Sequence, residues 1–215
     1  MSLTIPLFPL PGVVLLPGTL LPLHIFEPRY RAMVADALAG DRTIGMAMLR
    51  AGADADSGRS PIHTIGGAGE IIESEELEDG RYNILLEGKF RYRILDETES
   101  PGSPYRTARV EPLPSHPFAT DSEAAQISEL ARRTFEVVRP EVDLPPLPEE
   151  DVTPERLASE IALRLRYSPQ ELQAILETNS ISSRFGVLIG RMLEWEKRIE
   201  FLAPFRPSEI DATRN

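Results

Sequence analysis

Long apolar runs broken by proline and glycine mark the N-terminal part of the chain. Residues 3–26 contain no charged side chain. They do not fit a membrane-spanning helix, because interior prolines remove hydrogen bonds and clash with the preceding turn. A signal peptide would begin with basic residues, whereas the first cationic side chain here is Arg29. The pattern instead predicts three short buried strands separated by turns, at residues 5–8, 13–16 and 20–26.

One helix is predicted directly after these strands. Pro28 suits the first helical position, where its missing N–H costs nothing, and Gly40 is a typical helix end. Apolar side chains between them recur with a period of 3.6 residues. A strand is then expected at 44–48, whereas residues 51–60 lack large apolar side chains and are typical of a surface loop.

Alternation of apolar and polar residues continues to residue 113. We expect β structure at 62–72 and a hairpin turn at Asp79-Gly80. Apolar side chains then alternate in two runs, which is typical of half-buried antiparallel strands. Residues 105–113 are predicted to form the last strand. Six or more short strands with one helix indicate a compact, barrel-like β domain.

The C-terminal part has a helical pattern. A capping box at Thr120-x-x-Glu123 predicts a helix that reaches about Val138. Four prolines make residues 140–148 a rigid connector. Further helices are predicted from Pro154 and Pro169. The last helix repeats apolar residues at alternating intervals of three and four, typical of a packing seam, and Trp195 on this seam is expected in the core.

These patterns predict an α+β protein with two domains. Residues 1–115 would form the β-rich domain and residues 116–205 the helical domain. Residues 206–215 would be a frayed tail. Residues 3–26 offer no targeting segment, and the cysteine count of zero excludes disulfides and thiolate metal sites. A reducing cytoplasm is therefore the simplest location.

The charge balance narrows the function. With 34 acidic and 23 basic residues, the net charge is −11. This balance disfavours nucleic acids and anionic membranes as partners. Lys89 and Lys197 are the two lysines of the sequence, and neither follows the glycine-rich spacing of a phosphate-binding P-loop.

Two motifs suggest a cofactor or metal site, but neither matches the residue pattern that such a site requires. His24-x-x-Glu27 could supply two metal ligands, but Pro28 starts the helix after Glu27, so the two side chains do not share a helical face. Gly66-Gly67-Ala68-Gly69 lacks the third glycine and following helix of a dinucleotide site, and close packing of a strand explains it better. We expect no cofactor and no metal.

Four cations around the hairpin offer an alternative surface. Arg81, Lys89, Arg91 and Arg93 could contact phosphates from one strand face. Because acidic residues surround them, pairing with Glu70, Glu73 or Glu87 on neighbouring strands is favoured.

The N-terminal motif resembles a known family. Residues 5–18 read IPLFPLPGVVLLPG and residues 21–30 read LPLHIFEPRY, a pattern similar to the N-terminal domain of Lon proteases. DGRYNI at 79–84, the Gly88-x-Phe90 motif and Gln173 to Glu177 follow in the family's order. Where the family has Lys-Gln, this sequence has Leu172-Gln173. The resemblance covers about residues 3–203.

The resemblance implies a fold and a role. The fold would be a PUA-like β pseudo-barrel followed by an α-helical bundle. In Lon this region recognises substrates, while separate domains supply ATPase and peptidase. Neither a P-loop lysine nor the family's Ser–Lys pair has a counterpart here. The resemblance thus implies a stand-alone substrate-binding domain that is not an enzyme.

We favour a module that binds unfolded or partner polypeptides, as a possible component of proteolysis. An exposed apolar patch is then expected near the junction of the domains. An RNA-binding module using Arg81, Lys89, Arg91 and Arg93 is the main alternative, and a small-ligand receptor is a third. No catalytic residue is predicted. The candidate contact residues lie at the corner between the third strand and the first helix: His24, Glu27, Arg29 and Tyr30. Core packing of Tyr30 is the competing interpretation.

Overall fold

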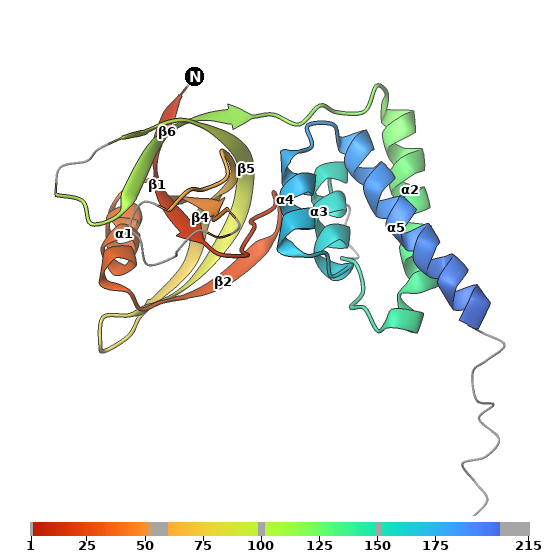
Figure 1. The fold of residues 1–215 in the computed structure, drawn as a ribbon, viewed down its shortest axis with the longest axis horizontal. Helices are drawn as coiled ribbons and strands as arrows, with labels where there is room; N and C mark the ends of the chain where they lie inside the picture. Colours follow the sequence, from red (N-terminus) through yellow and green to blue (C-terminus); the bar gives the residue numbers. More distant parts are fainter. Residues whose placement is uncertain (1, 51, 53–59, 99–101, 149–151, 203–215) are drawn as a thin grey trace, which may run out of the picture.

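The computed structural model describes residues 2–50, 52, 60–98, 102–148 and 152–202 of the 215. Strands and one helix come first, and helices follow (Figure 1). The strands are β1 (Leu3–Leu10), β2 (Leu20–Ile25), β3 (Thr43–Met48), β4 (Ile65–Glu76), β5 (Tyr82–Thr98) and β6 (Arg106–Leu113). The helices are α1 (Pro28–Ala39), α2 (Asp121–Val138), the short 3-10 helix η1 (Pro140–Val142), α3 (Pro154–Arg164), α4 (Pro169–Glu177) and α5 (Ile181–Leu202).

The six strands form a sheet that closes on itself. Their order is β2-β5-β4-β3-β1-β6, and β5 also pairs with β6. The pairs are antiparallel except for the parallel pair β1–β3. The two apolar runs predicted on either side of Gly88 are one 17-residue strand, β5. Its first half lies between β2 and β4 and its second half between β4 and β6, so β2 extends beyond the closed ring as an edge strand.

Residues 13–16 do not form the predicted strand. They are an irregular segment between β1 and β2 that crosses the sheet. Leu15 packs in the core beneath α1, while Leu16 joins the core of the helices. A Cβ on Gly67 would lie 2.0 Å from the Leu15 carbonyl oxygen, and one on Gly88 would lie 2.2 Å from the Leu16 carbonyl oxygen. The glycines of β4 thus serve close packing, as the sequence indicated, because no side chain fits under this segment.

The helices begin at the predicted residues. The hydroxyls of Thr120, Thr153 and Ser168 each accept a backbone N–H from three residues onward. The connector differs from the prediction at its start, where η1 forms, and its Leu144 and Leu147 are buried against the helices. Residues 149–151 and 203–215 lie outside the described residues.

Trp195 is not a fully buried core residue. The seam of α5 is buried at Phe185, Leu188 and Met192, whereas Trp195 and Ile199 are only partly buried. The reason is that the helices packed against α5 cover its N-terminal half more completely than its C-terminal half, where Phe201 is 71% exposed.

Arg91 joins the sheet to the helices. Its side chain is 1% exposed, and Nη1 donates to the carbonyl oxygens of Leu176 at 2.8 Å and Thr178 at 3.2 Å, at the end of α4. Burial lowers the pKa of Arg91 to about 10. Arg184 donates to the same Thr178 oxygen and pairs with Glu155 at 2.9 Å. The two guanidinium groups therefore lie at the negative end of a helix, where cations are favoured.

The junction is packed instead of open. Besides Leu16 and Arg91, the buried Gln173 donates to the Ile65 carbonyl oxygen at 2.9 Å, and His63 contacts Glu177 at 3.1 Å. These residues therefore do not form the exposed apolar patch that the sequence analysis predicted near the junction of the domains. In the described part of the chain, no helix combines the length and the apolar character needed to cross a membrane.

Candidate functional site

Three neighbouring strands, β2, β5 and β4, present one face to solvent. Figure 1 shows α1 and the helices α2–α5 on opposite sides of the sheet. The inward side chains of the three strands, such as Leu86 and Ile71, pack in the core that includes α1. We call the opposite side the outer face; its residues are Leu20, Pro22 and His24 of β2, Asn83, Leu85 and Glu87 of β5, and Glu70, Ile72, Glu73 and Glu75 of β4.

Apolar side chains occupy the middle of the outer face. Leu20 is 53% exposed and Ile72 is 39% exposed. Pro22 lies opposite Leu85, which is half-buried. Phe26, directly after β2, is 62% exposed. Leu20, Pro22, Leu85 and Ile72 are neighbours in the register, and Phe26 lies beyond the pair of His24 and Asn83. A group of exposed apolar side chains with a polar rim is typical of an interaction site.

A β-bulge brings Ile72 to this face. Leu86 of β5 pairs with Ile71, whereas Leu85, the residue before it, pairs with Glu73, so Ile72 has no partner of its own. The extra residue in β4 breaks the alternation. Ile71 is fully buried, and Ile72 and Glu73 are both exposed. The outer face therefore gains an apolar and an acidic side chain next to Leu85.

The free edge of β2 is partly blocked against pairing with another strand. Proline within a sheet is confined to edge strands because it cannot donate a hydrogen bond. Pro22 pairs with Leu85 in the register and must occupy a non-hydrogen-bonded position there. The backbone of Pro22 thus faces away from β5, and the free edge lacks a donor at its centre.

A hydrogen-bond network closes one end of the apolar group. Arg81 Nη1 lies 3.2 Å from His24 Nε2, and His24 Nδ1 lies 2.8 Å from Asn83 Oδ1. A neutral ring protonated on Nδ1 satisfies both bonds. Asn83 then donates to Glu75 Oε2 at 2.9 Å. Both ring nitrogens of His24 therefore contact neighbouring side chains, and neither contact involves Glu27.

Ion pairs neutralise the cations around the outer face. Arg81 Nε lies 2.6 Å from Asp79, and the hydrogen bond from the backbone N–H of Arg81 lowers the pKa of Asp79. At the other end Lys89 contacts Glu87 and lies 3.3 Å from Glu70. The hydrogen bond with Glu87 raises the pKa of Lys89.

The predicted corner residues are only partly a surface. Glu27 and Arg29 form an ion pair at 2.8 Å, and the Arg29 guanidinium lies 4.5 Å from the centre of the Tyr30 ring. Tyr30 is 5% exposed and packs 4.3 Å from Phe8, ring centre to ring centre, and burial raises its pKa. Tyr30 is thus a core residue, as the competing interpretation held.

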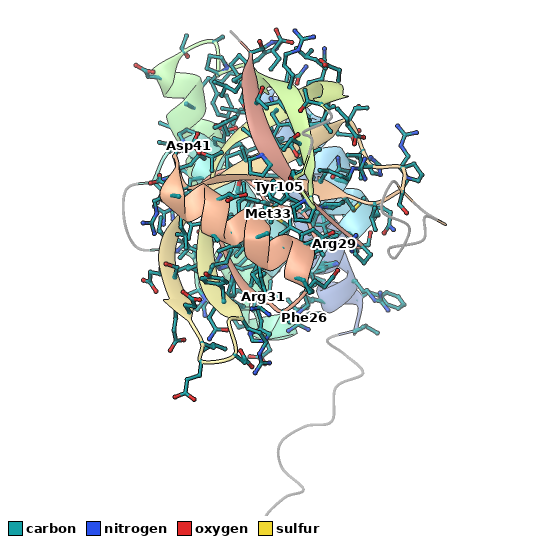
Figure 2. All side chains as sticks on the ribbon, turned by 90° about the vertical axis from the view of Figure 1, so that its left-hand side faces the viewer. Phe26, Arg29, Arg31, Met33, Asp41 and Tyr105 are labelled. Carbon is teal, nitrogen blue, oxygen red and sulfur yellow. The ribbon has the colours of Figure 1, made fainter. Side chains whose placement is uncertain are left out.

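Phe26 is the residue that the sequence analysis missed. Figure 2 shows Phe26 close to Arg29 and Arg31 at the N-terminal end of α1. Its ring centre lies 6.4 Å from that of His24, so the exposed phenylalanine continues the outer face into the corner. The signal was present in the alternation of residues 20, 22, 24 and 26, which places the four on one side of a strand.

The alternative basic face does not form. Arg91 is buried at the junction, and Arg81 and Lys89 are paired with carboxylates. Arg93 remains exposed. The expected pairing with neighbouring acids is confirmed for Lys89 and wrong for Arg91, whose partners are carbonyl oxygens. These four residues therefore do not form the basic surface that the RNA-binding alternative requires.

Comparison with curated proteins finds relatives among Lon proteases. The chain is 31% identical over 185 residues to the Lon protease of Trichlorobacter lovleyi, covering 80% of this chain and 22% of that protein. It is 27% identical over 196 residues to the Lon protease of Anaeromyxobacter dehalogenans, covering 86% of this chain and 22% of that protein. The chain thus spans less than a quarter of the length of these relatives.

Solved structures show the same fold. The N-terminal domain of the Mycobacterium avium complex Lon protease has a TM-score of 0.63 at 19% identity, covering 89% of this chain and 98% of that one. A Lon N-terminal domain protein from Xanthomonas campestris has a TM-score of 0.60 at 19% identity, covering 95% and 99%.

The family model for the substrate-binding domain of the ATP-dependent protease La (LON) matches residues 4–193. The domain that it describes is a non-catalytic one. The match extends from the first strand into α5, so it includes the sheet, the outer face and most of the helices. This chain belongs to the family of LON substrate-binding domains.

Proposed function

We propose that this chain is a non-enzymatic module that binds segments of other polypeptides, and that the outer face is where they bind. Membership in a substrate-binding family supports a polypeptide partner. The observation that carries the location is the group of exposed apolar side chains at Leu20, Pro22 and Phe26, in a sheet whose other face is buried against α1. Unfolded chains expose apolar side chains that folded proteins bury, so such a surface favours them.

Three features that the sequence predicts remain predictions: the PUA-like type of the closed sheet, the domain boundary near residue 116 and the cytoplasmic location. The corner residues His24, Glu27 and Arg29 would border the bound segment, while Tyr30 would support them from the core.

The test is binding of a labelled, permanently unfolded protein measured by fluorescence anisotropy. We expect micromolar affinity that survives high salt, because burial of apolar surface is not screened. The double variant Leu20→Ser/Phe26→Ser should weaken binding at least about tenfold, since each side chain contributes roughly 1.5–3 kcal/mol when fully buried.

The matched control is Leu95→Ser/Leu163→Ser, which removes two exposed apolar side chains outside the outer face. Its affinity should stay near that of the unmodified protein. Equal losses in both double variants would place the binding surface elsewhere, and no binding by the unmodified protein would refute the proposed function.

A further inference from the structure

The hairpin beside the apolar group is strongly acidic. Between residues 70 and 89 the sequence has seven acidic and two basic residues. β2 itself contributes no acidic or basic residue other than His24. An apolar strip therefore lies directly beside an excess of negative charge.

This negative charge is not neutralised within the described residues. The ion pairs of the hairpin engage Asp79, Glu70 and Glu87, and both cations of the hairpin take part in them. Glu73 and Glu75 have no cationic partner in the described part of the chain. Within the residues that the structure describes, the Glu75 carboxylate accepts a hydrogen bond from the neutral amide of Asn83, at 2.9 Å.

The register places these two carboxylates next to the apolar positions. Glu73 lies opposite Leu85, which in turn lies opposite Pro22. Glu75 and Asn83 follow two residues along, roughly 7 Å away at the rise of an antiparallel strand. An extended segment with an apolar side chain over Pro22 and Leu85 would bring its neighbouring side chains within reach of both carboxylates.

The position of Pro22 favours contact with the face over pairing with the edge. An added strand would need a donor at the centre of β2, where proline has none. Side chains of the bound segment, rather than its backbone, would then determine which sequences bind.

We propose that the outer face selects extended segments in which large apolar residues are flanked by lysine or arginine, with Glu73 and Glu75 contacting the basic side chains. This inference rests on the proposed function and adds the class of polypeptide. The partner is an unfolded or flexible chain, because an extended apolar segment is seldom exposed on a folded protein.

Three labelled peptides test the selection. They share one apolar core and carry lysines, serines or glutamates at both ends. At low salt the lysine peptide should bind about fivefold more tightly than the serine peptide, as expected for two exposed charge pairs, and the glutamate peptide should bind most weakly. High salt should bring the three affinities together.

Two variants separate a local contact from the overall charge of −11. Glu73→Gln/Glu75→Gln should abolish the preference for lysine and leave the serine peptide unchanged. Glu194→Gln/Glu200→Gln on α5 removes the same charge elsewhere and should keep the preference.

Equal binding of all three peptides would overturn the selection and leave the proposed function standing. A preference lost equally in both double variants would also overturn it, since the overall charge would then be the cause. Failure of every peptide and of the unfolded protein would instead refute the proposed function.

Discussion

Single residues can have opposite roles although they are neighbours on one strand. Arg91 and Arg93 share a strand and a side-chain type, and the sequence pattern placed both on one face. The register of β5 is regular from Arg91 to Arg93, so the two side chains do share a face; Arg91 is buried because it reaches the end of α4, whereas Arg93 is exposed. Arg91 then donates to the Leu176 oxygen, and it shares the Thr178 oxygen with Arg184.

We predict that Arg91→Ala lowers the free energy of unfolding by roughly 3–5 kcal/mol. The variant leaves the carbonyl oxygen of Leu176 without its cationic donor, and Thr178 keeps only Arg184 of its two cationic donors among the described residues. Urea denaturation followed by circular dichroism measures the effect. Arg93→Ala is the matched control and should change stability by less than about 0.5 kcal/mol. Similar effects in both variants would contradict the assignment of Arg91 as the link between sheet and helices.

At the scale of secondary-structure elements, glycine has different structural roles in β4 and in α5. In β4, Gly67 and Gly69 lie against Leu15 of the segment between β1 and β2, and a Cβ on Gly67 would collide with the backbone of Leu15. In α5 a Cβ on Gly186 or Gly190 would meet nothing within 4 Å in the described residues. Glycine destabilises a helix because it loses more conformational entropy on folding than other residues do. At these two positions no close packing with the described residues requires a glycine.

We predict that Gly186→Ala and Gly190→Ala each raise the free energy of unfolding by about 0.5–1 kcal/mol. The contrasting variant is Gly67→Ala, which should destabilise the protein because the Leu15 carbonyl oxygen must move. Chemical denaturation of the three variants is the measurement. A loss of stability in the α5 variants would show that these helix positions are not open.

At the scale of the whole molecule, buried contacts connect the sheet to the helices, and we therefore expect the two parts to unfold together. Leu16, Arg91 and Gln173 each connect the two parts. Trp195 is in α5, whereas four of the five tyrosines are in the part that contains the sheet. Tryptophan fluorescence and tyrosine near-ultraviolet signals therefore report on different parts.

We predict that the two signals change at the same temperature in the unmodified protein, as in a cooperative transition. Leu16→Ala removes the apolar side chain that the β1–β2 segment inserts among the helices. It should lower the midpoint of both signals by the same amount, because in a cooperative transition a cavity in the helical core destabilises the whole fold. Two separate transitions in the unmodified protein would mean that the parts unfold independently.

Most elements followed from the sequence because their signals are local. Period-two alternation, the turn at Asp79-Gly80, the capping box at Thr120 and the helix-starting prolines Pro154 and Pro169 depend on a few adjacent residues, and the structure has the corresponding strands and helices. The strand predicted at residues 13–16 was wrong because its apolar side chains are divided between two cores, which no local pattern reveals.

The family and the class of fold were thus determined by the sequence itself, through motifs that are contiguous in the chain. The site was decided by tertiary structure. His24 was recognised as a candidate, but Pro22, Leu85 and Ile72 come together only through the register of three strands and a bulge in β4. Pairing between strands depends on long-range contacts, and one inserted residue exchanges buried and exposed positions. The identity of the outer face therefore had to come from the folded sheet.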